Sequence, residues 1–451
     1  MRPRCKRAVR SVRRRCGAPS PAAAARCLAA LGLALAVIGC QARAPAATAT
    51  HTATAPAATP APGLPSPTPS PTPGLASPRA TISLWLSWEP DDLAALRRLV
   101  EAFIVDHPDL GVRITYFPAA ELQAAYRAAA GRPDGPTVVF GPSEWGVPLW
   151  QARLSQDLAG LLAPGVRQGL YPVSLSMVTY GEVVLGVPLS LDGVVLLANR
   201  DLMPEPAARV EDLIALPTVP DQEPPPPGWP DFGFRFAGGW LSACQGEWLD
   251  ARGRPAFESA GGVCWLELLR SMAPEGVFVQ NSTDDLLRFE AGQAPWLIDG
   301  TWNLPRLAAA RDLQALAIDP WPVHRATSLP LAGYTWSENG YVTAGLPPAD
   351  LEAAWELLRF LVTTESQTVL ADPLGAARLP VAREAVVADR LMSEALRSIT
   401  RGVPYPLRSE IGLYADPLEQ AARTFIRQEL DAAYVLERAV ERIELAQAAA
   451  P

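Results

Sequence analysis

The residues of this chain best suited to hold a small molecule are tryptophans and carboxylates in loop-like segments. The sequence contains 13 Trp. A flat indole ring stacks on an apolar C–H face, and a carboxylate accepts hydrogen bonds from hydroxyl groups at the rim of the same molecule. This combination is typical of a site for a sugar-like ligand. The stacking candidates are Trp88, Trp145, Trp240, Trp302 and Trp336, and the polar candidates beside them are Glu89, Glu144, Asp192, Asp299, Tyr334 and Glu338.

Each candidate also has a plain structural interpretation. A Trp belongs to a core at least as often as it serves as a ligand platform, and a lone loop acid is usually a solvated surface group. We expect Trp85, Trp265 and Trp355 in the core, because they fall on apolar faces of a strand or of helices. The case for binding is best in DGTWN (299–303), which follows the apolar run WLI and contains a Gly that lets backbone approach a ligand closely.

Motifs for catalysis are absent from the sequence. It has no H-E-x-x-H, no G-x-S-x-G and no phosphate-binding P-loop, and its three His residues are scattered. The acid pairs Asp91-Asp92 and Asp284-Asp285 stand at helix starts, where they complement the helix dipole. We therefore expect a binding protein without catalytic residues, metal or cofactor. Since a glycosidase needs only two opposed carboxylates, an exported carbohydrate-active enzyme stays an alternative.

The elements that position these residues alternate between strand and helix. The pattern predicts strands at 81–86, 112–117 and 136–141, with helices at 91–108 and 121–130 between them. Such alternation indicates an α/β fold with a mixed or mostly parallel sheet flanked by helices. In open α/β sheets, ligands bind beyond the carboxyl ends of strands, where most of the candidate residues lie.

The later segments repeat this pattern. The run EVVLGVPLSLDGVVLLANRDL (182–202) reads as two strand-like runs, and the segments 263–272, 283–292, 351–371 and 417–447 read as amphipathic helices.

The order of these segments resembles the extracellular solute-binding proteins of ATP-binding-cassette sugar importers, the group that contains maltose-binding protein. The matching stretches are ISLWLSW and HPDLGVRITYFP; PDGPTVVFG; YGEVVLGVPLSLDGVVLLANRDL; LRFEAGQAPWLIDGTWNL; and AAWELLRFLVTTESQTVLA. The resemblance departs from the family at Leu86, where His often precedes Ser-Trp, and at Cys244-Gln245-Gly246, where Gly-Gly is common. Arg378 resembles a residue of a late loop that often reaches the ligand, although surface charge is the preferred interpretation.

The resemblance implies a periplasmic-binding-protein-like fold of two lobes that close on a ligand by a hinge motion. Lobe 1 is expected from 81–190 and roughly 313–362, and lobe 2 from roughly 191–312 and 363–451. It further implies a monomer that captures a mono- or oligosaccharide for a membrane permease. The same fold binding a non-sugar solute, such as a glycerol phosphate, a polyamine or a peptide-like compound, remains open.

The first 80 residues are interpreted as targeting sequence and spacer. Residues 1–39 combine a basic start with the apolar run CLAALGLALAVIG, which is too short to span a bilayer. Val37-Ile38-Gly39-Cys40 resembles a lipobox, so we expect a signal peptide over 1–39 and a lipid on Cys40; a plain secretory or twin-arginine signal is the alternative. The rest of 40–80 is rich in Ala, Thr, Pro and Ser and should form a disordered tether of roughly 120 Å on the outer face of the membrane.

Charge and cysteine content narrow the partners further. Removing the nine basic residues before Cys40 leaves 30 basic against 47 acidic residues, a net charge of −17. So acidic a surface disfavours nucleic acid, and it leaves the lipid anchor as the membrane contact. Beyond Cys40 the chain has Cys244 and Cys264, which an oxidising compartment favours as a disulfide, with two separate thiols as the alternative.

Overall fold

The structure is a computed structural model that describes residues 78–215, 231–273, 283–310, 313, 315–428 and 430–449. The predicted signal peptide, Cys40 and nearly all of the predicted tether lie outside the described residues. Within the described part, we find no helix with the length and apolar character needed to cross a membrane.

The first elements form the α/β alternation expected from sequence. They are β1 (Ala80–Leu86), α1 (Pro90–Asp106), β2 (Leu110–Tyr116), α2 (Ala119–Ala129) and β3 (Val138–Pro142). Pro90 starts α1, where its missing N–H costs nothing, and the helix ends at Asp106, with His107 as its C-cap before Pro108. Strand β1 pairs in parallel with both β2 and β3, as expected for strands joined through helices. The predicted α/β fold is thereby confirmed.

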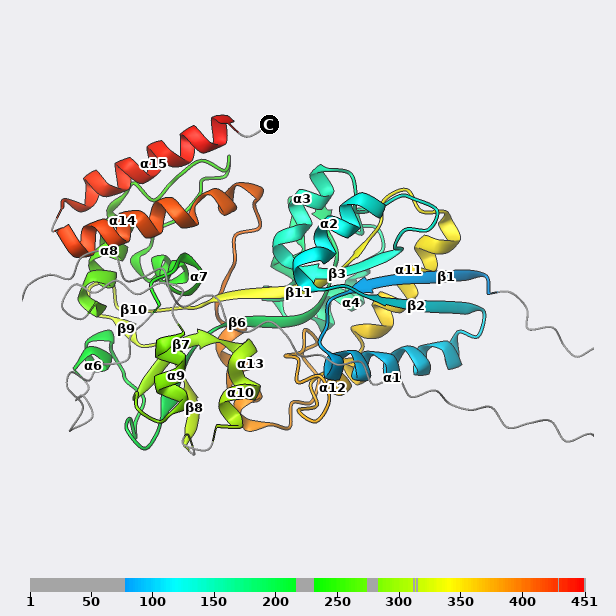
Figure 1. Ribbon diagram of the computed structural model, residues 1–451, viewed down its shortest axis with the longest axis horizontal. Helices are drawn as coiled ribbons and strands as arrows, with labels where there is room; N and C mark the ends of the chain where they lie inside the picture. The colour runs from blue at the N-terminus through cyan, green and yellow to red at the C-terminus, as the bar shows by residue number, and fades with distance from the viewer. Residues whose placement is uncertain are drawn as a thin grey trace, which may run out of the picture. The chain divides into compact units, whose positions relative to one another are not determined.

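Two long strands carry the sheet onward from β3. The segment expected to hold two strand-like runs forms the short β5 (Val183–Val184) and one long strand, β6 (Val187–Asn199), which lies beside β11 (Tyr334–Val342) (Figure 1). The order β2-β1-β3-β11-β6-β7 is parallel among β1 to β3 and antiparallel from β11 onward. The sheet is therefore mixed. The other strands are β4 (Thr179–Tyr180), β7 (Trp296–Gly300), β8 (Leu316–Asp319), β9 (Val323–His324), β10 (Leu329–Pro330) and β12 (Val403–Pro404).

Helices cover the sheet, and two of the segments expected to be helical are divided. Residues 351–371 belong to α11 (Pro348–Leu361) and α12 (Thr364–Leu370), which are separated at Val362 and Thr363. The Thr363 side chain accepts a hydrogen bond from the Ser366 N–H, which caps a new helix. Residues 417–447 belong to α14 (Ala415–Gln428) and α15 (Ala432–Ala449). The other helices are α3 (Gly146–Gln151), α4 (Pro164–Gly169), α5 (Pro172–Ser176), α6 (Val210–Ile214), α7 (Phe234–Ala237), α8 (Ala260–Met272), α9 (Asp284–Glu290), α10 (Leu304–Ala308) and α13 (Arg390–Ile399).

Strand β6 supplies apolar side chains to two core clusters. Val195 and Leu197 join the cluster with β1, α1 and α11, whereas Val194 and Leu196 join the cluster with α7, α8, α14 and α15. Successive residues of a strand point to opposite faces, so an uninterrupted apolar run such as VVLL needs cover on both sides. Trp265 is fully buried, and Trp85 and Trp355 are partly buried against a core. The boundaries given for the two lobes stay a prediction.

Close packing of α8 gives a first testable prediction. A Cβ on Gly262 would lie 1.9 Å from the Phe257 carbonyl oxygen, which is backbone and cannot rotate away. Gly262→Ala should therefore lower the free energy of unfolding by about 1–3 kcal/mol, despite a gain of about 1 kcal/mol in helix propensity. Gly165→Ala, in α4, is the control, because its Cβ would meet nothing within 4 Å. Urea titrations of both variants check this, and equal stabilities would contradict it.

Candidate ligand site

The candidate site is built on one face of the β6–β11 pair. Trp336 lies opposite Asp192, and Glu338 lies opposite Ser190, before an irregularity in the pairing. Directly opposed residues of an antiparallel pair share a face of the sheet. The Thr301 hydroxyl, just after β7, donates a hydrogen bond of 3.0 Å to the Asp192 carboxylate. Central residues of β6 and β11 and the residue that follows β7 thus meet at one place.

Trp302 is the exposed aromatic residue of this group. Its side chain follows β7, it is 42% exposed, and its ring centroid lies 6.1 Å from that of Trp336 in an edge-to-face arrangement. The ring rests on Gly300, where a Cβ would come within 2.1 Å of it. The glycine expected to let backbone approach a ligand instead provides the space for the indole ring. Trp145 rests on Gly141 in the same way and is partly buried.

Arg235 connects the aromatic pair to Glu144. Its guanidinium carbon lies 4.4 Å from the Trp336 ring centroid and 6.0 Å from that of Trp302. The same side chain forms an ion pair of 3.4 Å with Glu144, which follows β3, whereas Arg235 lies on α7. Burial raises the pKa of Glu144, and the charge of Arg235 opposes that shift.

Arg378 lies inside the site rather than on the surface, so the surface interpretation is wrong. Its side chain is 16% exposed and pairs with Asp92 at 2.7 Å and with Glu338 at 3.3 Å. The guanidinium also donates to the Ser190 hydroxyl at 3.2 Å and covers the Trp88 ring at 4.0 Å. Arginine fits here because its planar group forms several hydrogen bonds while stacking on a ring.

Two predicted site residues follow β1: Trp88 lies in the core, and Glu89 lies on the surface. Trp88 is only 2% exposed, and its indole N–H donates to Glu338 at 2.9 Å. In this structure it supports the site and presents no open ring face. Glu89 is exposed and precedes α1.

The remaining carboxylates are held by hydrogen bonds rather than by cations. Asp299 is buried and accepts from the Gly300 N–H at 2.6 Å and from the Asn303 amide at 2.9 Å; burial raises its pKa. Burial also raises the pKa of Asp192 to about 6, against the opposing effects of Arg378 and Thr301. Asp299 lies opposite Val195, so it faces away from Asp192 and Trp336 and is not brought into the site. The partly desolvated Asp192 carboxylate gains from hydroxyl donors, which suits a hydroxylated ligand.

Two predicted residues are buried beneath the site. Trp240 is 0% exposed within the cluster around α8, and Tyr334 is buried beside Phe234 and Trp336. Neither offers a free ring face in this structure. Arg235 and Tyr405, whose ring lies 5.3 Å from Trp336, were not expected. No sequence signal marks them, because α7 has four residues and Tyr405 follows a two-residue strand.

A cavity of about 850 Å³ is lined in part by Tyr334, whose ring lies beside Trp336 of the candidate site. Its walls come from the β4–β5 hairpin, the segment 238–251 and the segment that follows β12, including Arg408. The volume is within the usual range for small-molecule sites.

Comparison with solved structures shows the same fold in proteins that bind sugars. The GacH receptor of Streptomyces glaucescens, solved unliganded and with acarbose, is 17% identical with a TM-score of 0.64, covering 80% of this chain and 97% of that one. The maltose/maltodextrin-binding domain MalE of Bdellovibrio bacteriovorus, bound to maltotriose, is 21% identical with a TM-score of 0.62, covering 81% and 99%. An extracellular solute-binding protein of Staphylococcus aureus, in complex with maltose, is 14% identical with a TM-score of 0.71, covering 82% and 99%.

The sequence itself matches a family model. The model describes bacterial extracellular solute-binding proteins and matches residues 98–394, a range that runs from α1 to α13 and includes β6, β7 and β11. Together with the periplasmic-binding-protein-like fold, this match shows that the chain belongs to the family of bacterial extracellular solute-binding proteins.

Proposed function

We propose that this protein captures a mono- or oligosaccharide at the face of the β6–β11 pair. The observation that carries the proposal is the half-exposed Trp302 ring, seated beside Trp336, with the Asp192 carboxylate directly opposite Trp336 on β6. An indole face binds the C–H face of a sugar, and a carboxylate accepts hydrogen bonds from its hydroxyl groups.

The structural neighbours support a sugar as the ligand. Proteins of the same fold were solved with maltotriose, with maltose and with acarbose. Each match covers four-fifths of this chain or more, so the likeness extends well beyond one part of the fold.

The charges of the site argue against a phosphate ester. Both arginines already face carboxylates, Arg235 with Glu144 and Arg378 with Asp92 and Glu338. A phosphate would have to compete with those carboxylates and would also lie near Asp192. Carboxylates that outnumber the arginines favour a neutral, hydroxyl-bearing molecule or a cationic one.

Binding serves delivery to an ATP-binding-cassette permease, and no reaction is carried out on the sugar. The domain would act on the outer face of the cytoplasmic membrane, held by a lipid on Cys40 and lifted away by the segment 41–80. The family match supports an extracytoplasmic binding protein. The motif VIGC supports the anchor.

A saccharide panel tests the ligand class. A ligand that binds the folded state raises the melting temperature by mass action, so at least one mono- or oligosaccharide at millimolar concentration should raise Tm. Incubation with oligosaccharides should leave them uncleaved. A Tm that responds to a phosphate ester or a polyamine but to no saccharide would refute the sugar proposal.

Trp302→Ala should weaken binding of the sugar found in that panel by about tenfold or more, as truncation of a buried aromatic anchor usually does. Gly300→Ala should weaken it too, because a Cβ there would displace the Trp302 ring. Tyr434→Ala, half-exposed on α15, is the matched control and should bind within about twofold of the unaltered protein. Calorimetric titration measures all three, and unchanged binding by Trp302→Ala would exclude this platform.

The Asp192 carboxyl should give stability and binding opposite dependences on pH. Its pKa is raised from 3.8 to about 6, so the folded protein holds this proton more tightly than the unfolded chain. The stabilisation is complete below about pH 4 and is lost as pH rises through 6. Sugar binding should instead strengthen as pH rises through 6, because the ionised carboxylate is a better acceptor of hydrogen bonds from hydroxyl groups.

Asp192→Asn should flatten both pH dependences. Asp285→Asn is the matched control, because burial raises the pKa of Asp285 to about 6 as well, on α9. It should flatten the stability profile and leave the pH dependence of binding unchanged. Urea titrations and ligand titrations between pH 4 and 8 measure the two profiles, and identical binding profiles for the two variants would contradict the role of Asp192.

Cys40→Ser should abolish lipid attachment. In bacterial cells the variant should move from the membrane fraction to the soluble exported fraction, whereas the unaltered chain stays with the membrane. Detergent partitioning and mass spectrometry of the mature N-terminus detect the difference. An unaltered chain that carries no lipid would leave the plain secretory signal as the explanation.

A further inference from the structure

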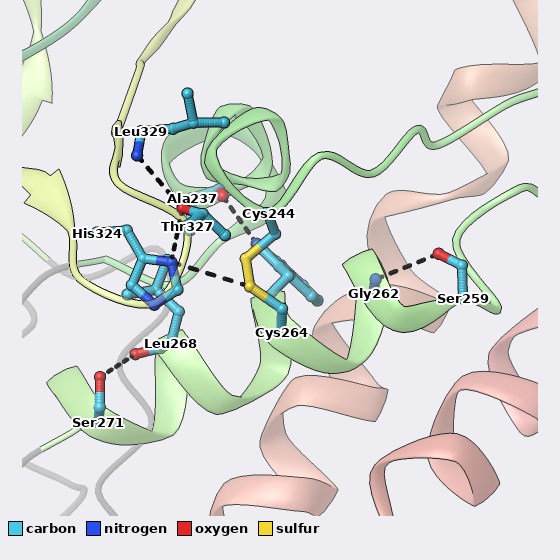
Figure 2. The surroundings of a disulfide bond; sticks show 11 residues. Ala237, Cys244, Ser259, Gly262, Cys264, Leu268, Ser271, His324, Thr327 and Leu329 are labelled. Carbon is cyan, nitrogen blue, oxygen red and sulfur yellow. Dashed lines mark hydrogen bonds between the residues drawn. A yellow bond between two sulfur atoms is a disulfide. The ribbon is translucent and has the colours of Figure 1, made fainter.

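A histidine of the short strand β9, which pairs with β10, lies directly beside the disulfide. Cys244 ends the 3-10 helix Gly238–Cys244, and it forms a disulfide with Cys264 of α8. Figure 2 shows the His324 ring of β9 turned toward this bond, with Nδ1 at 3.9 Å from the Cys264 sulfur. The donor atoms of the three residues lie within 4.8 Å of one another. In the described part of the chain, no other three His, Cys, Asp or Glu residues are grouped so closely.

Two thiolates and one imidazole are a donor set for a thiophilic metal ion. Zn²⁺ takes Cys sulfur at about 2.3 Å and His nitrogen at about 2.0–2.1 Å in tetrahedral geometry, which separates neighbouring donors by about 3.5–3.8 Å. The Cα atoms of Cys244 and Cys264 are 5.7 Å apart. Side-chain rotation alone can therefore place both sulfurs and Nδ1 around one ion, and water can take the fourth position.

The backbone around the three residues is held by contacts other than the disulfide. The Trp265 indole N–H donates to the Ala237 carbonyl at 3.0 Å, and Ser259 caps the start of α8 (Figure 2). The neighbouring Leu266 and Trp265 are fully buried. Reduction should thus leave the three donors in place. Cys264 and His324 are partly exposed, which gives an ion access.

We propose that Cys244, Cys264 and His324 form a binding site for Zn²⁺ or a similar thiophilic divalent ion when the disulfide is reduced. The disulfide is then the closed form of the site. A two-electron reductant, a dithiol or a phosphine, opens it: the phosphine takes the oxygen of one water molecule to give its oxide, and the S–S bond yields two thiols. The ion replaces the two thiol protons as it binds.

The test uses the full chain, reduced with a water-soluble phosphine under anaerobic conditions and then freed of it. Titration with Co²⁺ should give thiolate-to-cobalt charge transfer and the intense visible bands of tetrahedral coordination, at one ion per chain. Zn²⁺ should remove these bands. The oxidised protein should show neither the thiolate-to-cobalt charge transfer nor the visible bands of tetrahedral cobalt.

His324→Ala and His324→Asn should weaken Zn²⁺ binding more than tenfold, because loss of a ligand should cost at least as much as loss of a supporting contact. His107→Ala is the matched control, since His107 stacks on Phe103 far from the disulfide in sequence and fold, and it should bind Zn²⁺ unchanged. The double variant Cys244→Ser/Cys264→Ser retains the other four cysteines of the chain and gives the background signal.

Three outcomes would overturn the site. The first is a Co²⁺ spectrum that persists in the double serine variant, and the second is Zn²⁺ binding that both His324 variants retain. The third is loss of the cooperative thermal transition on reduction, with or without metal, which would show that the donors are not held in place. A normal thermal transition of each oxidised variant verifies that it has folded.

Discussion

The antiparallel pairing of β6 with β11 is the constraint on which the candidate site depends. β6 is apolar on both faces beyond Gly193, so it must be covered on both sides, and this fixes the strand between two core clusters. Its register with β11 then determines that Asp192 meets Trp336. A shift of β11 by one residue would turn Trp336 to the face opposite Asp192. The apolar half of the strand thereby positions the polar residues at its centre.

Electrostatic pairing organises the site around this junction. Arg378 draws together the start of α1, β6 and β11, and Arg235 joins α7 to the segment after β3. Both guanidinium groups also lie over tryptophan rings, Trp88 and Trp336. The Arg378 pairs are largely shielded from water and are costly to break singly, because the remaining charge stays desolvated. Arg378 therefore acts as a positioning residue for Trp88, whereas the Arg235–Glu144 pair is more exposed. Asp192 accepts a hydrogen bond from the Thr301 hydroxyl.

Much of the fold could be predicted from sequence, since strand and helix periodicity is local. The apolar alternation in ISLWLSW and the apolar spacing of 91–108 define β1 and α1 directly. What could not be predicted is which tryptophans keep an open face. Trp240 and Trp302 have similar loop-like contexts in sequence, but the first is enclosed by α8 and its neighbours and the second rests on Gly300 with one side free. Burial of a loop residue depends on which distant elements pack over it, and the local sequence pattern does not predict that packing. Arg378 was misjudged for the same reason, because its partners Asp92 and Glu338 are remote in the chain.

The contact between Gly300 and Trp302 has a consequence for the thermodynamics of recognition. An indole pressed against bare backbone has few rotamers open to it even before a ligand arrives, so little side-chain entropy is lost when a ring stacks on it. The proposed stacking platform is thus preorganised by the absence of a Cβ at Gly300. Under this proposal, changes in the surrounding carboxylates and loops would alter ligand preference without altering the rigid indole surface.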